Sequence, residues 1–181
     1  MKTFSVIVIT LLFITLQACS EQQNTSSPKS NRTQSVIPTA QSPSKILEPQ
    51  KQIKNAVLDE LQEGRWELVM FWATYCPICK KDFEKLAQFI KENPSIPLTI
   101  VGVVTDGLEE KQKALRQIDQ RQLNYTHVLT DFDRSDELYH EITESRLIGV
   151  PSQLLYNTNN ELVGFSRNAI DLDALEIIVY E

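Results

Sequence analysis

Hydrophobic residues along this chain fall into short continuous runs and into stripes with helical spacing. The run Leu68–Trp72 has the length and residue types of a strand that is buried on both faces. In the segment that follows, apolar residues recur at helical spacing and charged residues occupy the opposite side. The apolar positions are Phe83, Leu86, Ala87 and Ile90, and the charged positions are Lys80, Lys81, Glu84, Lys85 and Lys91. The pattern predicts a buried strand leading directly into an amphipathic helix, which Pro94 brings to an end.

The rest of the pattern predicts one helix before this unit and alternating strands and helices after it. The first helix spans about Gln50–Gln62, where apolar residues recur every four positions. The later elements are a strand over Pro97–Thr105, a helix over Glu109–Leu123, a strand over Tyr125–Thr130, a helix over Asp136–Ile142, strands over Gln153–Tyr156 and Leu162–Ser166, and a helix that Asp171 caps and that runs to about Tyr180. The asparagine-rich segment 157–160 favours a tight turn, so the last two strands form an antiparallel hairpin. This order predicts an α/β domain: a mixed sheet with helices on both faces.

The N-terminus has the pattern of an export signal. Phe4–Leu16 is mostly apolar, too short to span a membrane and of the right length for the core of a signal peptide. The tetrapeptide that ends in Ala18-Cys19 resembles the bacterial lipobox, which implies cleavage before Cys19 and lipidation of that residue; the alternative is a plain secretory signal with a chance cysteine. We expect a protein lipid-anchored in the bacterial cell envelope and facing the periplasm, and Ser20 favours the outer membrane over the inner one.

Residues 19–49 are rich in Ser, Gln, Thr, Asn and Pro and have no periodic apolar pattern, so we expect a disordered tether there. Residues 50–181 are long enough for one domain with a single core. Loss of Lys2 with the signal peptide changes the net charge from −6 to −7. An acidic chain without a basic stripe argues against binding to nucleic acid.

Cys76-Pro77-Ile78-Cys79 lies where the buried strand gives way to the helix. Pro77 suits the first helical position, so Cys76 is expected at the helix N-terminus, facing unpaired N–H groups. Such surroundings favour the thiolate, and the pKa of the first cysteine in a C-x-x-C pair falls to roughly 3.5–7.5. Cys79, one turn later, is close enough to form a disulfide with Cys76. The spacing suits attack by Cys76 on a partner disulfide and resolution by Cys79.

Other uses of a C-x-x-C pair fit less well. A zinc site needs two more ligands, but the chain has only one further cysteine, Cys19, and its histidines, His127 and His140, lack finger-like spacing. A c-type haem site needs His directly after the second cysteine, where this chain has Lys80. A structural disulfide would close too small a loop to stabilise much. We therefore expect redox chemistry by the cysteines themselves, with no metal and no other cofactor.

Two motifs resemble those of thioredoxin-like proteins. Phe71-Trp72-Ala73 precedes the cysteine pair, and Val150-Pro151, about 70 residues further on, leads into the predicted hairpin. The helix and strand predicted over Glu109–Thr130 resemble the insertion of membrane-anchored TlpA/ResA-type thiol–disulfide oxidoreductases. The resemblance covers residue 50 to the C-terminus. It implies a thioredoxin-like sheet with an extra α-β insertion before a cis-proline.

The resemblance also implies roles for single residues. Cys76 would be the exposed nucleophile and Cys79 the buried resolving thiol. Pro151 would be a cis-proline whose loop lies against the disulfide, with the Val150 backbone pairing with a substrate segment. The alternative for Pro151 is an ordinary trans proline at the start of a strand. Trp72 is expected beneath the active site, either within the substrate-binding region or as a core aromatic.

Asp82 follows Cys79 by three residues, which places both on one face of the helix. An acidic residue here is thought to handle protons near the thiols of TlpA/ResA-type proteins, and the resemblance implies that role for Asp82. The alternative is a charge that merely favours the first turns of a helix. Plain thioredoxins use a buried Asp six residues before the first cysteine, where this chain has Met70. The remaining polar candidates are expected at surface or half-buried positions without a catalytic role: Lys80, Lys81, His127 and His140.

These residues are interpreted as those of an envelope thiol–disulfide reductase of exported proteins. Ile78 offers no charge to stabilise the Cys76 thiolate, so we expect a reduction potential nearer to thioredoxin's ~−270 mV than to DsbA's ~−120 mV. The implied partners are disulfide-bonded exported proteins, such as cytochrome c apoproteins, an upstream thiol electron donor, and the membrane through Cys19. Two other functions stay open: a copper-handling module, which the two-residue cysteine spacing disfavours, and a non-catalytic module that binds proteins beside Pro151.

Overall fold

A six-stranded mixed sheet forms the centre of residues 43–180, the part of the chain that the computed structural model describes. The strands lie in the order β1 (Lys45–Leu47), β4 (Thr126–Leu129), β3 (Leu98–Val104), β2 (Trp66–Trp72), β5 (Ser152–Tyr156) and β6 (Leu162–Ser166). The first four strands of this order pair in parallel, and β2–β5 and β5–β6 pair antiparallel. The predicted fold class is confirmed. The signal peptide, Cys19 and residues 20–42 of the predicted tether lie outside the described residues.

The central strand β2 is the buried apolar run that the sequence predicts, and its alternating side chains contribute to two cores. Successive side chains of a strand point to opposite faces of the sheet. Met70 and Trp72 therefore belong to one hydrophobic core, while Val69 and Phe71 belong to the other. Because both faces of β2 are covered, the strand shows no alternation of polar and apolar residues in the sequence.

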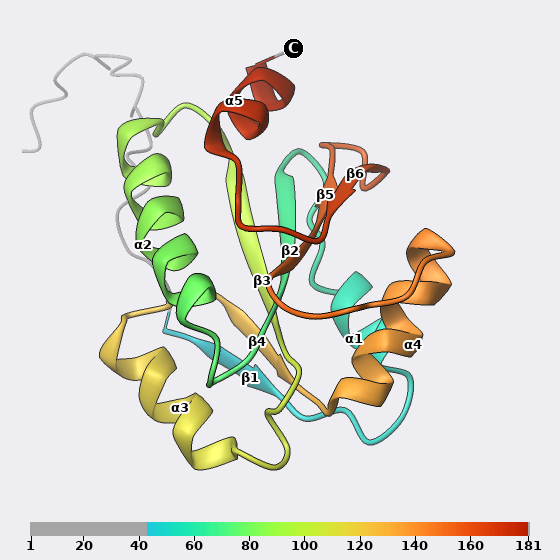
Figure 1. The fold of residues 1–181 in the computed structure, drawn as a ribbon. Helices are drawn as coiled ribbons and strands as arrows, with labels where there is room; N and C mark the ends of the chain where they lie inside the picture. The colour runs from blue at the N-terminus through green and yellow to red at the C-terminus, as the bar shows by residue number, and fades with distance from the viewer. Residues whose placement is uncertain (1–42, 181) are drawn as a thin grey trace, which may run out of the picture. The chain divides into compact units, whose positions relative to one another are not determined.

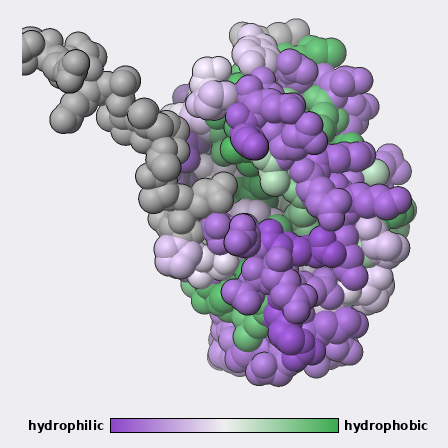
Figure 2. Space-filling model, turned by 90° about the vertical axis from the view of Figure 1, so that its left-hand side faces the viewer, coloured by the Kyte–Doolittle hydropathy of each residue, from purple (hydrophilic) through white to green (hydrophobic). Residues whose placement is uncertain are grey.

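Within residues 43–180, five helices cover the two faces of the sheet (Figure 1). They are α1 (Ile53–Leu58), α2 (Pro77–Glu92), α3 (Lys111–Gln120), α4 (Phe132–Thr143) and α5 (Leu172–Tyr180). Side chains of α2, α3 and α5 pack in one core, and side chains of α1 and α4 pack in the other. The side of the molecule that α2 and α3 form is mostly hydrophilic, with apolar groups between the polar ones (Figure 2). None of the helices within residues 43–180 is long and apolar enough to cross a membrane.

The largest differences from the sequence prediction lie at the start of the domain. Residues 45–47, assigned there to the disordered tether, form β1 and pair with β4. Three residues are too few to show a periodic pattern, and the pairing with β4 defines this strand. The helix predicted over residues 50–62 is shorter and spans only α1, because Gln52 adopts a left-handed conformation with φ of 56° just before it.

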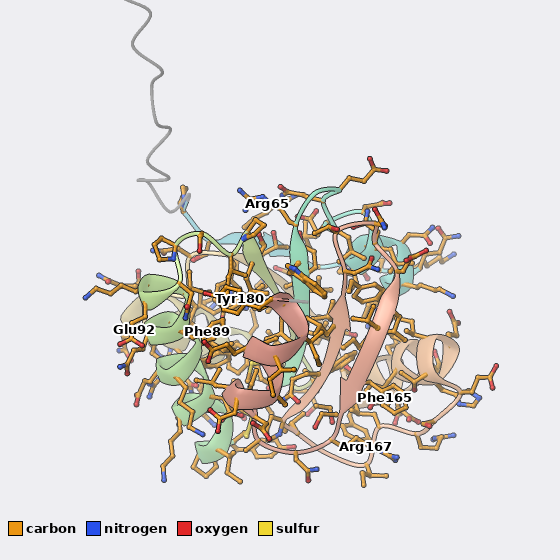
Figure 3. The ribbon with its side chains drawn as sticks, turned by 90° about the horizontal axis from the view of Figure 1, so that it is seen from above. Arg65, Phe89, Glu92, Phe165, Arg167 and Tyr180 are labelled. Atoms are coloured by element: carbon orange, nitrogen blue, oxygen red, sulfur yellow. A yellow bond between two sulfur atoms is a disulfide. The ribbon has the colours of Figure 1, made fainter. Side chains whose placement is uncertain are left out.

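The helix that carries the cysteines buries a different set of residues than predicted. Its buried positions include Asp82 and Phe89, whereas Ala87, predicted to face inward, is exposed. The end of α5 lies beside the last turn of α2, where Tyr180 donates a hydrogen bond to Asn93 at 3.0 Å (Figure 3). Asp171 caps α5 by accepting a hydrogen bond from the Ala174 N–H at 3.1 Å, which confirms the predicted cap.

Candidate active site

The site begins at the disulfide between Cys76 and Cys79, whose Cα atoms are 5.4 Å apart. Cys76 is the N-cap residue of α2, and Pro77 is the first residue of that helix. The Sγ of Cys76 accepts a hydrogen bond from the Cys79 N–H at 3.0 Å. The positive end of the helix dipole and one of its free N–H groups therefore face this sulfur. The predicted position of the pair at the N-terminus of a helix is confirmed.

Both cysteines are buried in the disulfide, which corrects one prediction. Cys79 is fully buried, as predicted, but Cys76 is only 4% exposed and is not the exposed residue that the resemblance implies. The loop before β5 covers it, because the Val150 carbonyl oxygen lies 3.8 Å from the Cys76 Sγ. Of the two cysteines, only Cys76 keeps any exposure, so we expect an attacking thiol to reach the pair at this residue.

The segment before β5 forms the second wall of the site. The peptide bond between Val150 and Pro151 is cis, as the resemblance implies. The Ser152 hydroxyl donates a hydrogen bond to the Gly149 carbonyl at 2.9 Å, and Ser152 pairs with Phe71 in the sheet. Because β5 runs antiparallel beside β2, the start of β5 lies next to the end of β2, from which the cysteine loop leaves. The sheet therefore brings Val150-Pro151 to the disulfide across 74 residues of sequence.

Three apolar side chains on these segments are exposed to solvent. Tyr75, directly before the first cysteine, is 64% exposed, Ile78 within the pair is 49% exposed, and Ile148 is 75% exposed. We call these three residues the apolar rim. Exposed apolar groups gathered beside a reactive group are typical of surfaces that bind another protein.

Asp82 lies in the second turn of α2 and points into the core, where it is fully buried. Its Oδ2 accepts a hydrogen bond from the Ile170 N–H at 3.1 Å, and its Oδ1 lies 3.9 Å from the Lys85 Nζ. Burial raises the pKa of the Asp82 carboxyl, although the hydrogen bond from Ile170 opposes this change. The carboxyl therefore holds its proton to a higher pH than an exposed aspartate, one helical turn from Cys79. The proton-handling role stays a prediction.

Trp72 and His127 are both buried, and only His127 is placed differently from the sequence prediction. Trp72 is 1% exposed and packs edge-on against Phe83 and His127, as the core-aromatic alternative expects, and its assignment to substrate binding stays a prediction. His127 was expected at the surface or half-buried but is fully buried, which lowers the pKa of its imidazole to about 4. The reason is Gly102 on β3: a Cβ there would overlap the His127 ring, so the missing side chain makes room for it. His140 and Lys81 are exposed and Lys80 is half-buried, as predicted.

Three residues that support the site escaped the sequence analysis: Thr74, Asp106 and Gln117. Thr74 lies in the loop between β2 and α2, Asp106 follows β3, and Gln117 is on α3. The Asp106 carboxylate accepts hydrogen bonds from the Thr74 N–H and hydroxyl, and Gln117 donates to the Thr74 carbonyl. One signal for Asp106 was available. The carboxyl ends of neighbouring parallel strands meet at one edge of a sheet, and Asp106 is the first charged residue after β3.

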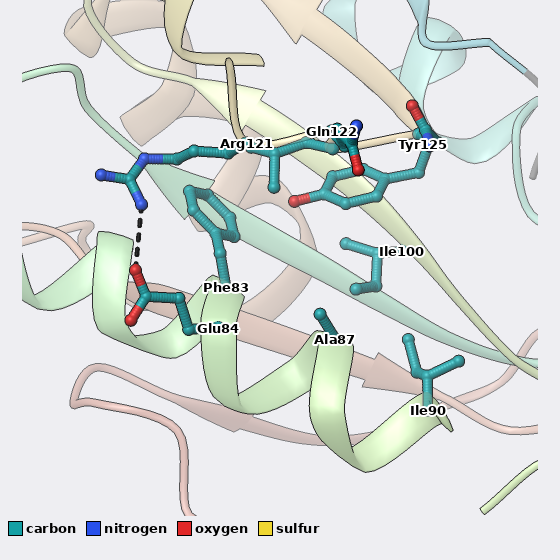
Figure 4. Close-up of a pocket in the computed structure, with 10 residues that line it drawn as sticks. Phe83, Glu84, Ala87, Ile90, Ile100, Arg121, Gln122 and Tyr125 are labelled. Atoms are coloured by element: carbon teal, nitrogen blue, oxygen red, sulfur yellow. Dashed lines mark hydrogen bonds and ion pairs between the residues drawn. The ribbon is translucent and has the colours of Figure 1, made fainter. Parts of the chain in front are cut away.

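A separate cavity of about 150 Å³ lies between α2 and the segment that leads into β4 (Figure 4). Phe83, Ile100 and Tyr125 are among its lining residues, and the ion pair of Glu84 with Arg121, 3.1 Å long, lies at one end. Neither cysteine lines this cavity, so we do not assign it to the site. Within residues 43–180, no three His, Cys, Asp or Glu side chains are grouped so that they could hold a metal ion.

The chain is similar to a family model and to a thiol-disulfide oxidoreductase. Residues 38–163 match the model of the AhpC/TSA family. The chain is 27% identical over 101 residues to the sporulation thiol-disulfide oxidoreductase A of Bacillus subtilis (strain 168), which covers 55% of this chain and 58% of that protein. The match therefore spans less than two thirds of that relative.

Two solved structures have a similar fold. The first is a thiol:disulfide interchange protein of the thioredoxin family from Chlorobium tepidum TLS, with a TM-score of 0.55 and 19% identity over 70% of this chain and 82% of that one. The second is the thioredoxin domain of a thiol-disulfide oxidoreductase from Bacteroides vulgatus, with a TM-score of 0.52 and 22% identity over 65% of this chain and 81% of that one. These likenesses show that the fold is thioredoxin-like.

Proposed function

The chain belongs to the AhpC/TSA family, and within it we propose that this protein is a thiol–disulfide oxidoreductase that uses Cys76 and Cys79 as its redox pair. The observation that carries the proposal is the position of the disulfide at the N-terminus of α2, with the Val150 carbonyl 3.8 Å from the Cys76 sulfur. A thiolate forms most readily at such a position, and a backbone segment beside it can pair with an extended substrate segment.

The reaction proceeds by two thiol–disulfide exchanges. The Cys76 thiolate of the reduced protein attacks one sulfur of a substrate disulfide, which forms a mixed disulfide and releases the other substrate sulfur as a thiolate that takes up a proton. The Cys79 thiol then loses its proton and attacks the Cys76 sulfur. This step releases the second substrate thiol and leaves the Cys76–Cys79 disulfide. Two electrons have then passed to the substrate, and a donor dithiol returns the pair to its reduced form.

The surroundings of the pair support a protein substrate. The apolar rim provides exposed side chains in the two segments that form the site, the cysteine loop and the segment before β5. An extended polypeptide segment that passes over Val150 can place its own disulfide against Cys76, while its apolar side chains cover the rim. The substrate class that we propose is therefore an unfolded or extended protein segment with apolar residues next to its cysteine.

We propose the finer assignment to the TlpA/ResA type on two features. One is the presence of α3 and β4 between β3 and the cis-proline, and the other is the buried Asp82 one turn after Cys79. In this assignment Asp82 takes and returns the Cys79 proton during the second exchange. The lipobox-like sequence at Cys19 and the residue Ser20 support a lipid anchor, a place in the cell envelope facing the periplasm, and the outer membrane.

We propose that the direction is reduction of the substrate. The residues between the cysteines are Pro77 and Ile78, neither of which carries a charge that stabilises the Cys76 thiolate. A less stabilised thiolate gives a more reducing couple. Equilibration of the purified protein with reduced and oxidised glutathione measures this property, and a potential above about −150 mV would overturn the reductase assignment.

The test of the function is to trap the mixed disulfide. In a Cys79→Ser variant, Cys76 can attack a substrate but the product cannot be resolved, so adducts should accumulate on Cys76 in cells. They should disappear on reduction and should contain exported proteins that carry disulfides. The matched control is the double variant Cys76→Ser/Cys79→Ser, which should form no adducts. A Cys79→Ser variant without adducts, or a double variant that fully rescues a deletion strain, would overturn the enzymatic proposal in favour of a binding module.

A further inference from the structure

The loop between β2 and α2 is held at a single residue, Thr74. Its N–H donates to both carboxylate oxygens of Asp106 at 3.0 and 3.1 Å, and its hydroxyl donates to Oδ2 at 2.6 Å. Its carbonyl accepts a hydrogen bond from the Gln117 side-chain amide at 3.0 Å. Every polar group of Thr74 is therefore engaged, and Thr74 stands two residues before Cys76.

The residues that hold Thr74 come from two elements outside the loop. Asp106 follows β3 and is 8% exposed, so its carboxylate is held in a fixed place. Gln117 is on α3, the helix inserted between β3 and β4. The neighbouring Thr105 adds two hydrogen bonds to the Trp72 carbonyl, from its N–H at 2.9 Å and its hydroxyl at 3.3 Å. The end of β2 and the start of the loop are thus fixed against β3 and α3.

Asp106 also places a negative charge close to the redox pair. Its oxygens are within 3.1 Å of the Thr74 nitrogen, and two residues of chain separate Thr74 from Cys76. The carboxylate is therefore within roughly 10 Å of the Cys76 backbone. Among the described residues no Lys, Arg or His forms an ion pair with Asp106. A negative charge without a cation partner disfavours formation of a second negative charge nearby.

From these contacts we infer that Asp106 and Gln117 are positioning residues for the redox pair: both hold Thr74 so that Cys76 stays at the N-terminus of α2, and the Asp106 charge additionally restrains the Cys76 thiolate. The inference rests on the proposed function for its biological meaning. It assigns a task to α3, which in this chain connects to the active-site loop through Gln117. It also adds a second reason for a reducing couple beside the uncharged Ile78.

The two residues are distinguished by opposite effects on the acidity of the Cys76 thiol. Asp106→Asn keeps an acceptor oxygen for Thr74 but removes the charge, so the thiol should become about tenfold more acidic. Gln117→Met keeps the side-chain length but removes the donor. The loop then loosens, Cys76 faces the helix N-terminus less closely, and the thiol should become several-fold less acidic. If both substitutions merely disturbed the fold, they would not change the acidity of the Cys76 thiol in opposite directions.

The measurement is the rate of Cys76 alkylation as a function of pH, on protein reduced chemically beforehand. The matched control is Asp131→Asn, which also neutralises a carboxylate that accepts a backbone N–H hydrogen bond, but as the N-cap of α4, and it should leave the profile unchanged. Circular dichroism establishes that each variant is folded, and Gln117→Ala replaces Gln117→Met if the latter is not. Unchanged profiles in both folded variants would overturn the inference, and shifts of the same sign would overturn the charge effect of Asp106.

Equilibrium with glutathione provides a second readout. In that reaction the Cys76–Cys79 disulfide takes two electrons and two protons from two glutathione thiols, which leaves the dithiol and one glutathione disulfide. Asp106→Asn stabilises the thiolate of the reduced form, so the equilibrium constant should move toward the dithiol by up to about tenfold, or about 30 mV. Alkylation shifts as expected without adducts on Cys79→Ser would keep the inference and overturn the proposed function. Adducts on the Cys79→Ser variant without these alkylation shifts would keep the proposed function and overturn the inference.

Discussion

The protonation of a buried side chain in this protein depends on which of its polar atoms have hydrogen-bond partners. Asp82 is fully buried and has one backbone hydrogen bond, which satisfies Oδ2, while Oδ1 has only the distant Lys85 ammonium at 3.9 Å. A buried carboxyl with incomplete hydrogen bonding favours its neutral form, which explains the direction of its pKa. Such a group keeps its proton to a higher pH than an exposed aspartate does, which suits the proton transfer that the second exchange at Cys79 requires.

Asp82→Asn should slow the second exchange and change its pH dependence. Asparagine can still accept the hydrogen bond from Ile170 but cannot take a proton, so we expect resolution of the mixed disulfide to slow by about tenfold or more. Because the pKa of Asp82 is raised, the wild-type rate should change at a pH above the usual aspartate range, and the variant should lack that change. Single-turnover exchange measured between pH 4 and 8 tests this.

The control for Asp82 is Glu84→Gln. Glu84 is on the same helix, but its side chain is 71% exposed and pairs with Arg121 on the surface. Its neutralisation should leave the exchange rate and its pH profile as in the wild-type protein. An Asp82→Asn profile that coincides with both would show that Asp82 serves only the packing of α2 against the segment before α5.

At the scale of elements, β2 is decisive because it leads into the cysteine loop and contains a buried acid, Glu67. Glu67 is fully buried near the start of the strand, where its Oε1 accepts a hydrogen bond from the Gln62 N–H at 3.2 Å. Its Oε2 finds no hydrogen-bond partner among residues 43–180. Burial raises the pKa of Glu67 from 4.5 to about 7. The strand is therefore more stable when Glu67 is protonated.

Glu67→Gln should remove a pH dependence of stability. The pKa of Glu67 is higher in the folded than in the unfolded protein, so the free energy of unfolding is highest below about pH 4.5 and falls as the pH rises through about 7. The full loss for such a shift is on the order of 3 kcal/mol. The variant should therefore be more stable than the wild type at pH 8. Denaturant unfolding at pH 5 and pH 8 measures the difference.

Glu63→Gln is the control for Glu67, because Glu63 is an exposed residue just before the same strand. It should keep the pH dependence of the wild-type protein. If the wild-type protein is equally stable at pH 5 and pH 8, burial does not raise the pKa of Glu67. Glu67→Gln would then be no more stable than the wild type at pH 8.

Elements with a strong local pattern were predictable from the sequence, and contacts across the sheet were not. The strand and helix around Cys76-Pro77 follow from the apolar run and from helix-start chemistry, so the disulfide lies where the pattern puts it. The cis form of Pro151 came from family resemblance, because proximity across 74 residues leaves no local pattern. The burial of His127 depends on Gly102 in a neighbouring strand, and the Thr74–Asp106 contact depends on strand order. Such pairings cannot be read from one sequence without the register.

At the scale of the whole molecule, the site is assembled by strand order. The central pair β2–β3 delivers the cysteine loop and Asp106 to the same edge of the sheet, and the antiparallel β5 delivers Pro151 beside them. The far edge ends in β1, which pairs with β4 and contributes Ile46 and Leu47 to the two cores. The folded unit therefore includes residues that the composition alone assigns to the tether.

Two truncations test this boundary. A chain that begins at residue 43 keeps β1 and should unfold at the same temperature as the full chain. A chain that begins at residue 50 lacks β1, which exposes the edge of β4 and removes the two half-buried side chains of Ile46 and Leu47. We expect it to lose about 2–3 kcal/mol of unfolding free energy. Thermal melts of both chains provide the measurement, and equal melting temperatures would place the start of the folded unit after β1.

The small exposure that Cys76 keeps, against none for Cys79, makes the protein regioselective. Because Cys79 is fully buried and Cys76 is 4% exposed, a donor thiol can attack the disulfide only at Cys76. Reagents of any size should label the protein at one sulfur atom, and every covalent partner recovered from cells should map to the same peptide. The geometry therefore sets the order of the exchange: each partner forms its mixed disulfide with Cys76, and Cys79 then resolves it.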